Sequence, residues 1–177
     1  MTRGQTPAMS VAAVVLAAGA ATRFGAPKQR LLLPRVLARL AAAPVDDVVV
    51  VGGAHPLGDA AGSARVVTCS EWERGPGASL RCALAILPPE TEAAVVVLAD
   101  GPTLAPEAVS RVVAAWREGA GPVVAASYDG GRGHPLLVAR ELWDAVPDEG
   151  LRALEPALVP CDDLGPPGDV DTRADLP

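Results

Sequence analysis

Short runs of apolar residues, rich in valine, recur along the chain and predict buried β-strands. They cover residues 11–17, 46–51, 65–68, 94–99 and 122–127. Within each run the apolar residues follow one another without alternating with polar ones. This is typical of parallel strands that are covered on both faces. The pattern therefore predicts a sheet enclosed between two layers of helices.

Between these runs, apolar residues recur at helical spacing. The spacing predicts helices over 35–43, 78–87 and 107–118, the last beginning after Pro106 with the acidic Glu107 in its first turn. Strands and helices in alternation predict an α/β fold, a three-layer α/β/α sandwich with a mostly parallel, Rossmann-like sheet. The stretch 128–138 breaks the rhythm with a glycine-rich turn and then apolar residues. It predicts a further strand, for which an antiparallel direction is one option.

The ends of the chain and its apolar runs bound the domain organisation. Residues 1–9 are polar and are expected to form a disordered tail, whereas 10–177 are expected to form a single domain. No apolar run reaches the ~18 residues of a membrane span. The run 11–21 could pass for the core of a signal peptide, but glycine and then Arg23 and Lys28 follow it, which favours a strand entering a loop. We expect a cytoplasmic protein with no membrane partner.

Cysteine usage gives no sign of a disulfide framework or a zinc site. Cys69, Cys82 and Cys161 are odd in number and widely spaced, and none belongs to a C-x-x-C pair. The expectation is three reduced thiols, most of them buried.

Charge and composition single out one residue. The chain has 14 Arg but one Lys, Lys28, together with one Phe, one Tyr, one Ile and no Asn, as expected for a GC-rich gene. Such a gene tends to replace Lys by Arg wherever the two are interchangeable, so Lys28 marks a place where a compact ammonium is needed, or else a chance survivor. The net charge of -6 argues against non-specific binding to nucleic acid. Residues 1–45 carry six cations and no acid, which still allows a small anionic ligand.

The first predicted strand leads into a loop of small residues that carries two cations. Leu16-Ala17-Ala18-Gly19 is followed by Arg23 and Lys28. Backbone N–H groups of such a loop can approach phosphate oxygens closely. Neither the Rossmann G-x-G-x-x-G nor the Walker pattern is present. An ordinary strand–helix loop remains an alternative on composition alone.

The spacing in this loop is more specific than its composition. It is L-A-A-G, three residues, Arg, one residue, Gly, two residues, Lys. This resembles the signature of nucleotidyltransferases with the molybdenum-cofactor transferase fold, and within them the molybdenum cofactor cytidylyltransferases. The resemblance covers about residues 11–176. It implies a fold of the nucleotide-diphospho-sugar transferase type. The implied reaction moves an NMP, CMP from CTP above all, onto a phosphorylated acceptor such as molybdopterin and releases pyrophosphate.

Two acids are candidate metal ligands. Asp100 follows the run 94–99, and an acid at the carboxyl end of a buried parallel strand faces the crevice where α/β sheets bind ligands. Its carboxylate suits Mg²⁺, with Mn²⁺ as an option, although it could instead cap the next helix. Family members commonly have Gln where this chain has Gly101. Asp169-Val-Asp171-Thr172 resembles a family motif that implies Asp171 as the second ligand, with helix capping by Asp171 or Thr172 as the alternative.

Further motifs suggest where the two substrates bind. Residues 70–84 resemble the family segment near the base and ribose, which makes Ser79 a binding candidate as well as a candidate N-cap. Gly133-His134-Pro135 resembles a family motif that implies contact with the acceptor. His55 is interpreted as structural, and Trp72, Trp116 and Trp143 as packing residues.

By this resemblance, the catalytic cations are Arg23, on the β- and γ-phosphates, and Lys28, on the α-phosphate. The implied nucleotide-binding set is Leu16, Ala17, Ala18, Gly19, Arg23, Lys28, Ser79 and Asp100. The chain after Lys28 lacks the family's Gly-x-Pro turn. This shortening favours a non-catalytic nucleotide-binding protein as an alternative. A guanylyltransferase or another NTP transferase on the same fold, and an NAD(P)H-linked oxidoreductase, are further alternatives. The expected partners are small molecules, and the expected state is a monomer or a weak homo-oligomer.

Overall fold

The computed structural model describes residues 9–20 and 28–176. Its strands are β1 (Ser10–Leu16), β2 (Asp47–Gly52), β3 (Arg65–Thr68), β4 (Thr91–Leu98), β5 (Val123–Tyr128), β6 (Gly131–Ala139) and β7 (Ala157–Pro160). They form one sheet in the order β3-β2-β1-β4-β6-β5-β7. Only β6 runs antiparallel to its neighbours, β4 and β5; the other neighbouring pairs are parallel. The mostly parallel sheet and the antiparallel option for 128–138 are both confirmed.

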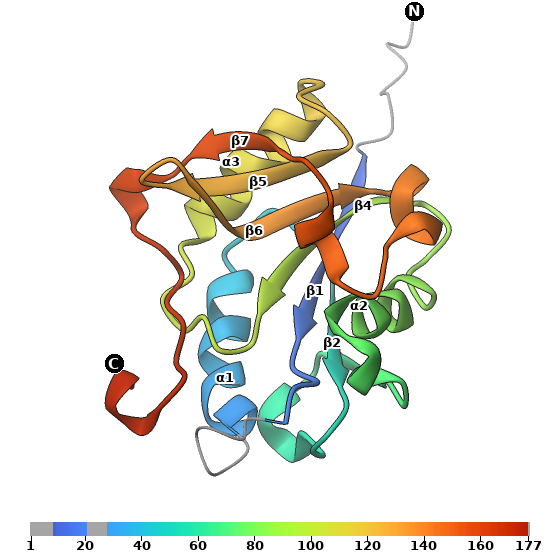
Figure 1. Cartoon of the computed structure of the whole chain (residues 1–177), viewed down its shortest axis with the longest axis vertical. Helices are drawn as coiled ribbons and strands as arrows, with labels where there is room; N and C mark the ends of the chain where they lie inside the picture. The colour runs from blue at the N-terminus through green and yellow to red at the C-terminus, as the bar shows by residue number, and fades with distance from the viewer. Residues whose placement is uncertain (1–8, 21–27, 177) are drawn as a thin grey trace, which may run out of the picture.

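Helices cover both faces of the sheet (Figure 1). They are α1 (Lys28–Leu40), α2 (Pro76–Leu84) and α3 (Pro106–Arg117). Short 3₁₀ turns are η1 (Gly58–Ala61), η2 (Trp72–Arg74), η3 (Arg140–Ala145), η4 (Gly150–Ala153), η5 (Asp162–Leu164) and η6 (Arg173–Asp175). Helices α1 and α3 pack on one face through residues such as Val36 and Val112. Helix α2 and η3 pack on the other face through residues such as Leu80 and Trp143. This arrangement is the predicted three-layer sandwich.

Helix α1 differs most from its prediction. It begins at Lys28 rather than at residue 35 and ends at Leu40, with Pro34 inside it. A proline inside a helix removes one backbone hydrogen bond and so disfavours a helix that runs through it. The spacing of Leu32, Leu33, Val36 and Leu40 overrides this cost, because all four side chains are buried. Lys28 therefore lies on a helix rather than on a loop.

The two edges of the sheet also depart from expectation. Strand β3 has its predicted bounds, but three of its four residues are exposed because it is an edge strand. Strand β7, at the other edge, was not predicted because four residues with alternating burial give too short a pattern. In the part of the chain that the structure describes, no helix is both long and apolar enough to cross a membrane.

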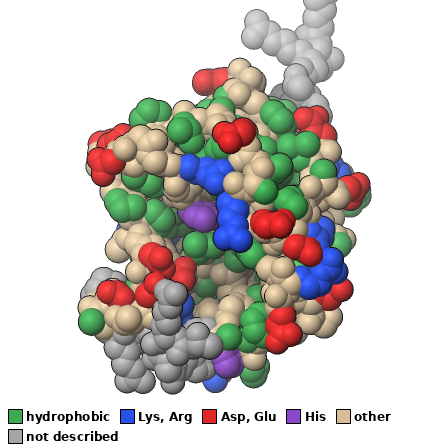
Figure 2. All heavy atoms as spheres, viewed as in Figure 1, with side chains coloured by type: hydrophobic (Ala, Val, Ile, Leu, Met, Phe, Trp, Pro, Cys, Tyr) green, Lys and Arg blue, Asp and Glu red, His purple; other side chains and the backbone are tan. Residues whose placement is uncertain are grey.

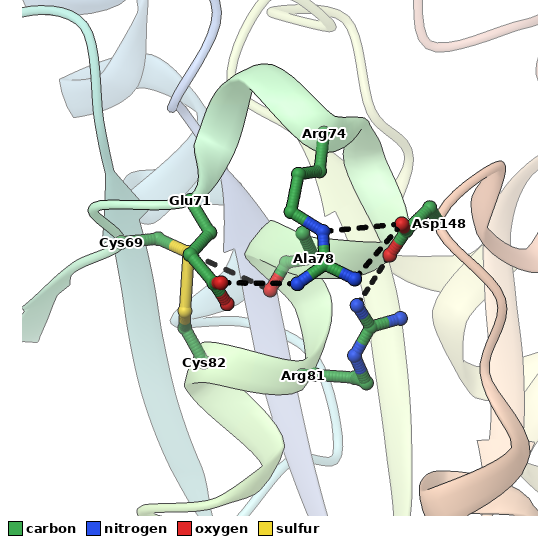
Figure 3. The surroundings of a disulfide bond; sticks show 7 residues. All are labelled: Cys69, Glu71, Arg74, Ala78, Arg81, Cys82 and Asp148. Carbon is green, nitrogen blue, oxygen red and sulfur yellow. Dashed lines mark hydrogen bonds and ion pairs between the residues drawn. A yellow bond between two sulfur atoms is a disulfide. The ribbon is translucent and has the colours of Figure 1, made fainter.

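The prediction of three reduced thiols is wrong. Cys69 and Cys82 form a disulfide with their Cα atoms 5.8 Å apart (Figure 3). Cys161 is a buried free thiol. Cys69 directly follows β3 and Cys82 lies in α2, so the fold brings together two residues that no short motif connects. The bridge closes the segment that leads from β3 into α2.

Candidate active site

A cavity of about 530 Å³ lies at the carboxyl ends of β1 and β4. These strands are neighbours at the point where the strand order reverses direction, which is where α/β sheets bind their ligands. The cavity is lined by Leu16, Ala18, Gly19, Lys28, Gln29, Trp72, Gly75, Pro76, Ser79, Leu98, Ala99, Asp100 and Asp171. Figure 2 shows this face hollowed between groups of acidic and basic side chains.

Lys28 lies between the two predicted metal ligands. Its Nζ is 2.9 Å from Asp100 Oδ2 and 3.5 Å from Asp171 Oδ1. The same ammonium donates a hydrogen bond to the carbonyl oxygen of Val170 at 2.6 Å. Only 8% of the residue is exposed. The single lysine of the chain therefore occupies a place where a compact cation is held by three oxygens from two distant segments.

The electrostatics of this cluster favour positive charge. Burial lowers the pKa of Lys28, but the hydrogen bond to Asp100 and the charges of Asp100 and Asp171 outweigh burial and raise it above its usual value. The pKa of the neighbouring Asp169 is raised by burial and then by the charges of Asp100 and Asp171. Lys28 is thus fully charged at neutral pH, and carboxylates outnumber it.

The donor set fits a divalent cation that is shared with a substrate. In the residues the structure describes, no three His, Cys, Asp or Glu side chains form a group that could hold a metal. Mg²⁺ commonly needs only one or two carboxylates because substrate phosphates and water complete its shell. Asp100 and Asp171 supply two, and the Lys28 ammonium already shows that both face a common cationic position.

Neither Asp100 nor Asp171 is a helix N-cap, which was the alternative role for each of them. Helix α3 has Ala105 as its N-cap, which leaves Asp100 to pair with Lys28. Near the C-terminus, Thr172 caps the short turn η6, and its backbone N–H donates to Asp175 Oδ2 at 2.7 Å. Asp171 faces Lys28, as the metal-ligand prediction requires.

The loop after β1 reaches the cavity through some of its predicted residues. Leu16, Ala18 and Gly19 line it. Ala17 does not, because it is buried and its N–H donates to the carbonyl of Val51 at 2.9 Å, which continues the pairing with β2. Arg23 lies outside the described residues.

The opposite wall comes from η2 and α2. Ser79 lines the cavity, but the prediction that it caps a helix is wrong: Gly75 is the N-cap, Pro76 the first helical residue and Ser79 the fourth. Gly77 is required by close packing, since an added Cβ would lie 1.7 Å from the carbonyl oxygen of Pro147. This contact fixes the start of α2 against the segment after η3.

Several lining residues were missed from the sequence. Trp72, predicted to pack, is half-buried against the core and also lines the cavity, whereas Trp143 is buried as predicted. Gln29, Gly75 and Pro76 had no motif to mark them. Gln29 directly follows Lys28 at the start of α1, and that position was the one available signal.

The predicted acceptor motif borders two further cavities. One, of about 290 Å³, contains Gly133, His134 and Arg132 and shares Leu16, Pro76 and Leu98 with the first cavity. The other, of about 500 Å³, also contains Gly133 and His134 and extends to Asp169. Pro135 is buried within β6 and lines neither of them. Two of the three predicted residues are therefore beside the first cavity, not inside it.

Comparison with known proteins decides the family. The family model described as "MobA-like NTP transferase domain" matches residues 13–156. The chain belongs to this family. This MobA-like chain is a nucleotidyltransferase, as its loop signature predicted.

Solved structures agree with this assignment. Rv0371c from Mycobacterium tuberculosis H37Rv is 29% identical, with a TM-score of 0.78 over 96% of both chains. Rv0371c in complex with manganese is 27% identical, with a TM-score of 0.75 over 94% of this chain and 95% of that one. The 4-diphosphocytidyl-2C-methyl-D-erythritol synthase of Anaerococcus prevotii, 15% identical with a TM-score of 0.71, covers 94% of this chain and 92% of its own. It shares the fold, that of the nucleotide-diphospho-sugar transferases. No curated protein sequence matches the chain.

Proposed function

We propose that this MobA-like protein transfers CMP from CTP to a phosphorylated acceptor, with molybdopterin as the acceptor, and releases pyrophosphate. One observation carries the proposal: the sole lysine is held between Asp100 and Asp171 and lines a cavity that residues of the small-residue loop also line. A cation, two acids and exposed backbone beside one another are the groups that phosphoryl chemistry needs.

The reaction needs positioning and charge neutralisation rather than covalent help from the protein. A terminal phosphate oxygen of the acceptor attacks the α-phosphorus of CTP in line, and the bond to the β-phosphate oxygen breaks, so that pyrophosphate leaves. Because the attacking phosphate is already anionic, no general base is required. Lys28 stabilises the charge that develops on the α-phosphate, and Arg23 holds the β- and γ-phosphates.

Asp100 and Asp171 would hold a divalent cation, Mg²⁺ by preference. When bound, that cation supplies charge neutralisation for the phosphates. The manganese complex of Rv0371c supports a divalent metal in a related chain. Nucleotide contacts come from Leu16, Ala18, Gly19 and Ser79.

The acceptor would occupy the cavities around Gly133 and His134. Leu98 lines all three cavities, so acceptor and nucleotide can meet beside the end of β4. Burial lowers the pKa of His134, which leaves its ring neutral at neutral pH. A neutral ring can share a hydrogen bond with the acceptor without holding its phosphate by charge.

The test is nucleotide-dependent stability followed by product release. CTP, GTP, ATP and UTP are each added with Mg²⁺ and the melting temperature is recorded, because a ligand that binds only the native state raises it. We expect CTP to give the largest increase, and CTP with molybdopterin to release pyrophosphate. A larger increase with GTP would replace CTP in the proposal. No increase with any of the four would contradict it.

A further inference from the structure

Contacts to three consecutive backbone carbonyl groups, those of residues 18–20, hold the start of the loop after β1. The carbonyl oxygen of Ala18 accepts a hydrogen bond from the backbone N–H of Ala54 at 3.0 Å. That of Gly19 accepts from Gln29 Nε2 at 2.8 Å. That of Ala20 lies 2.9 Å from His55 Nε2, and because a carbonyl only accepts, this nitrogen carries the hydrogen.

This arrangement fixes where the N–H groups of the loop point. In a trans peptide the C=O and N–H bonds point in opposite directions. Holding the carbonyls of Ala18 and Gly19 against α1 and the chain after β2 therefore turns the N–H groups of Gly19 and Ala20 away from that scaffold. Oriented N–H groups in succession are what an anionic oxygen requires.

Gln29 is unlike an ordinary packing residue. Only 6% of it is exposed, and it lies in the first turn of α1 beside Lys28. Its Nε2 donates a hydrogen bond to the carbonyl oxygen of Gly19. Its Oε1 is buried and has no hydrogen-bond partner among the residues that the structure describes, 9–20 and 28–176. Burying an acceptor without a hydrogen bond costs free energy that an apolar side chain at this position would avoid. The amide is retained for the contact that it makes with the loop.

The chain after β2 is fitted closely to the loop after β1. A Cβ on Gly53 would lie 2.8 Å from the Cβ of Ala18 and 2.8 Å from Trp72, so glycine is required for this approach. It places Ala54 and His55 within hydrogen-bond distance of the loop carbonyls. His55, interpreted from the sequence as structural, is thus attached to the loop.

We propose that Gln29 and His55 are positioning residues for the triphosphate. They hold the loop after β1 in one conformation, so that its N–H groups can bind phosphate oxygens without the entropic cost of ordering the loop on binding. The proposal rests on the function proposed above. Both side chains contact carbonyl oxygens of the loop, and Gln29 also lines the cavity. Their effect acts on nucleotide affinity through Gly19 and Ala20, because preorganisation removes an entropic cost from binding.

The test measures binding of tripolyphosphate, CTP and CMP, each with Mg²⁺, by titration calorimetry. Gln29→Met and His55→Phe remove one anchor each, and His55→Gln keeps a donor at this position. We expect Kd for tripolyphosphate and CTP to rise about tenfold in the first two variants, as for the loss of about 1.4 kcal/mol. CMP, with one phosphate, is expected to lose less, and His55→Gln is expected to stay within about twofold of the wild type.

Trp143→Phe is the matched control. It removes another side-chain N–H bond to a backbone carbonyl, from Nε1 to Val138 at 3.2 Å, in a residue that does not line the nucleotide cavity. It should lower the melting temperature and leave Kd unchanged. Unchanged Kd in both anchor variants, or an equal loss for CMP and CTP, would overturn the positioning role alone. A wild type that binds neither tripolyphosphate nor CTP would overturn the proposed function instead.

Discussion

The ammonium of Lys28, at the first residue of α1, lies 2.9 Å from the carboxylate of Asp100, two residues after the end of β4. Asp171 completes the arrangement from the far end of the chain at 3.5 Å. A lysine and a divalent cation that need the same carboxylates compete for them. An incoming phosphate gives Lys28 another anion to pair with and so leaves the acids to the metal.

This competition predicts that Lys28→Met binds Mn²⁺ more tightly than the wild type does when no nucleotide is present. Removal of a buried cation from two carboxylates leaves negative charge for the metal to neutralise. We expect Kd for Mn²⁺, followed by electron paramagnetic resonance, to fall about tenfold, equivalent to about 1.4 kcal/mol. The variant should also be less stable without metal and gain more in melting temperature from Mn²⁺. An unchanged or weaker affinity for Mn²⁺ would show that Lys28 does not occupy the metal position.

The single lysine also predicts the result of a conservative change. Lys28→Arg keeps the charge but replaces the compact ammonium that Asp100, Asp171 and Val170 surround by a planar fork of different shape and reach. We expect kcat to fall by about 10²-fold, the scale for loss of one charge-stabilising group. A fully active arginine variant would remove the reason for a lysine here. Arg39→Lys, an exposed change on the same helix, serves as the control.

The disulfide predicts a stability effect that depends on the redox state. Cys69 and Cys82 are 13 residues apart and enclose the segment that carries Trp72, Gly75 and Ser79. Cross-linking a loop of about this size stabilises a protein by about 3 kcal/mol in the chain-entropy description. Reduction with a dithiol, or Cys82→Ser, should lower the melting temperature and weaken CTP binding. Cys161→Ser leaves the bridge intact and is the control. Equal melting temperatures in oxidised and reduced protein would show that the disulfide does not stabilise the fold.

His134 predicts a loss of stability in acid. Burial lowers its pKa below the ordinary 6.5, with a further contribution from Arg132 that the charge of Asp100 opposes. The unfolded chain therefore binds this proton at a higher pH than the folded protein, and stability falls as pH drops below about 6.5. In chemical denaturation at pH 7 and pH 5.5, His134→Gln should lose less stability than the wild type. Parallel losses in the two proteins would assign the acid effect to other groups.

Much of the fold follows from local patterns. Uninterrupted valine-rich runs predicted the buried strands, and Pro106 placed the start of α3 within one residue, since the helix begins at Pro106 rather than at 107. The start of α1 was missed because rules for proline describe the backbone, whereas burial of Leu33 and Val36 is a property of the whole fold. Strand β7 was missed because its four residues only become a strand beside β5.

The candidate site was predicted in its chemistry but not in its contacts. Composition marked Lys28, the end of a predicted strand marked Asp100, and the resemblance to a family motif marked Asp171. The structure brings the three together. The hydrogen bonds of Gln29 and His55 to the loop after β1 depend on how α1 and the chain after β2 pack against that loop. No local sequence pattern indicates this packing. The Cys69–Cys82 bridge escaped for the same reason, since odd cysteine counts and wide spacing describe sequence, not distance.

The most direct test of the proposed transferase is pyrophosphate release from CTP in the presence of Mg²⁺ and molybdopterin, compared between the wild type and Asp100→Asn. The variant keeps the size of the side chain and removes the charge that Lys28 and a divalent cation share. Asp163→Asn, which loses an exposed pairing with Arg111, is the matched control. We predict release by the wild type and the control and a fall of about 10²-fold or more in Asp100→Asn. No release by the wild type, or a rate in Asp100→Asn close to that of the wild type, would contradict the account.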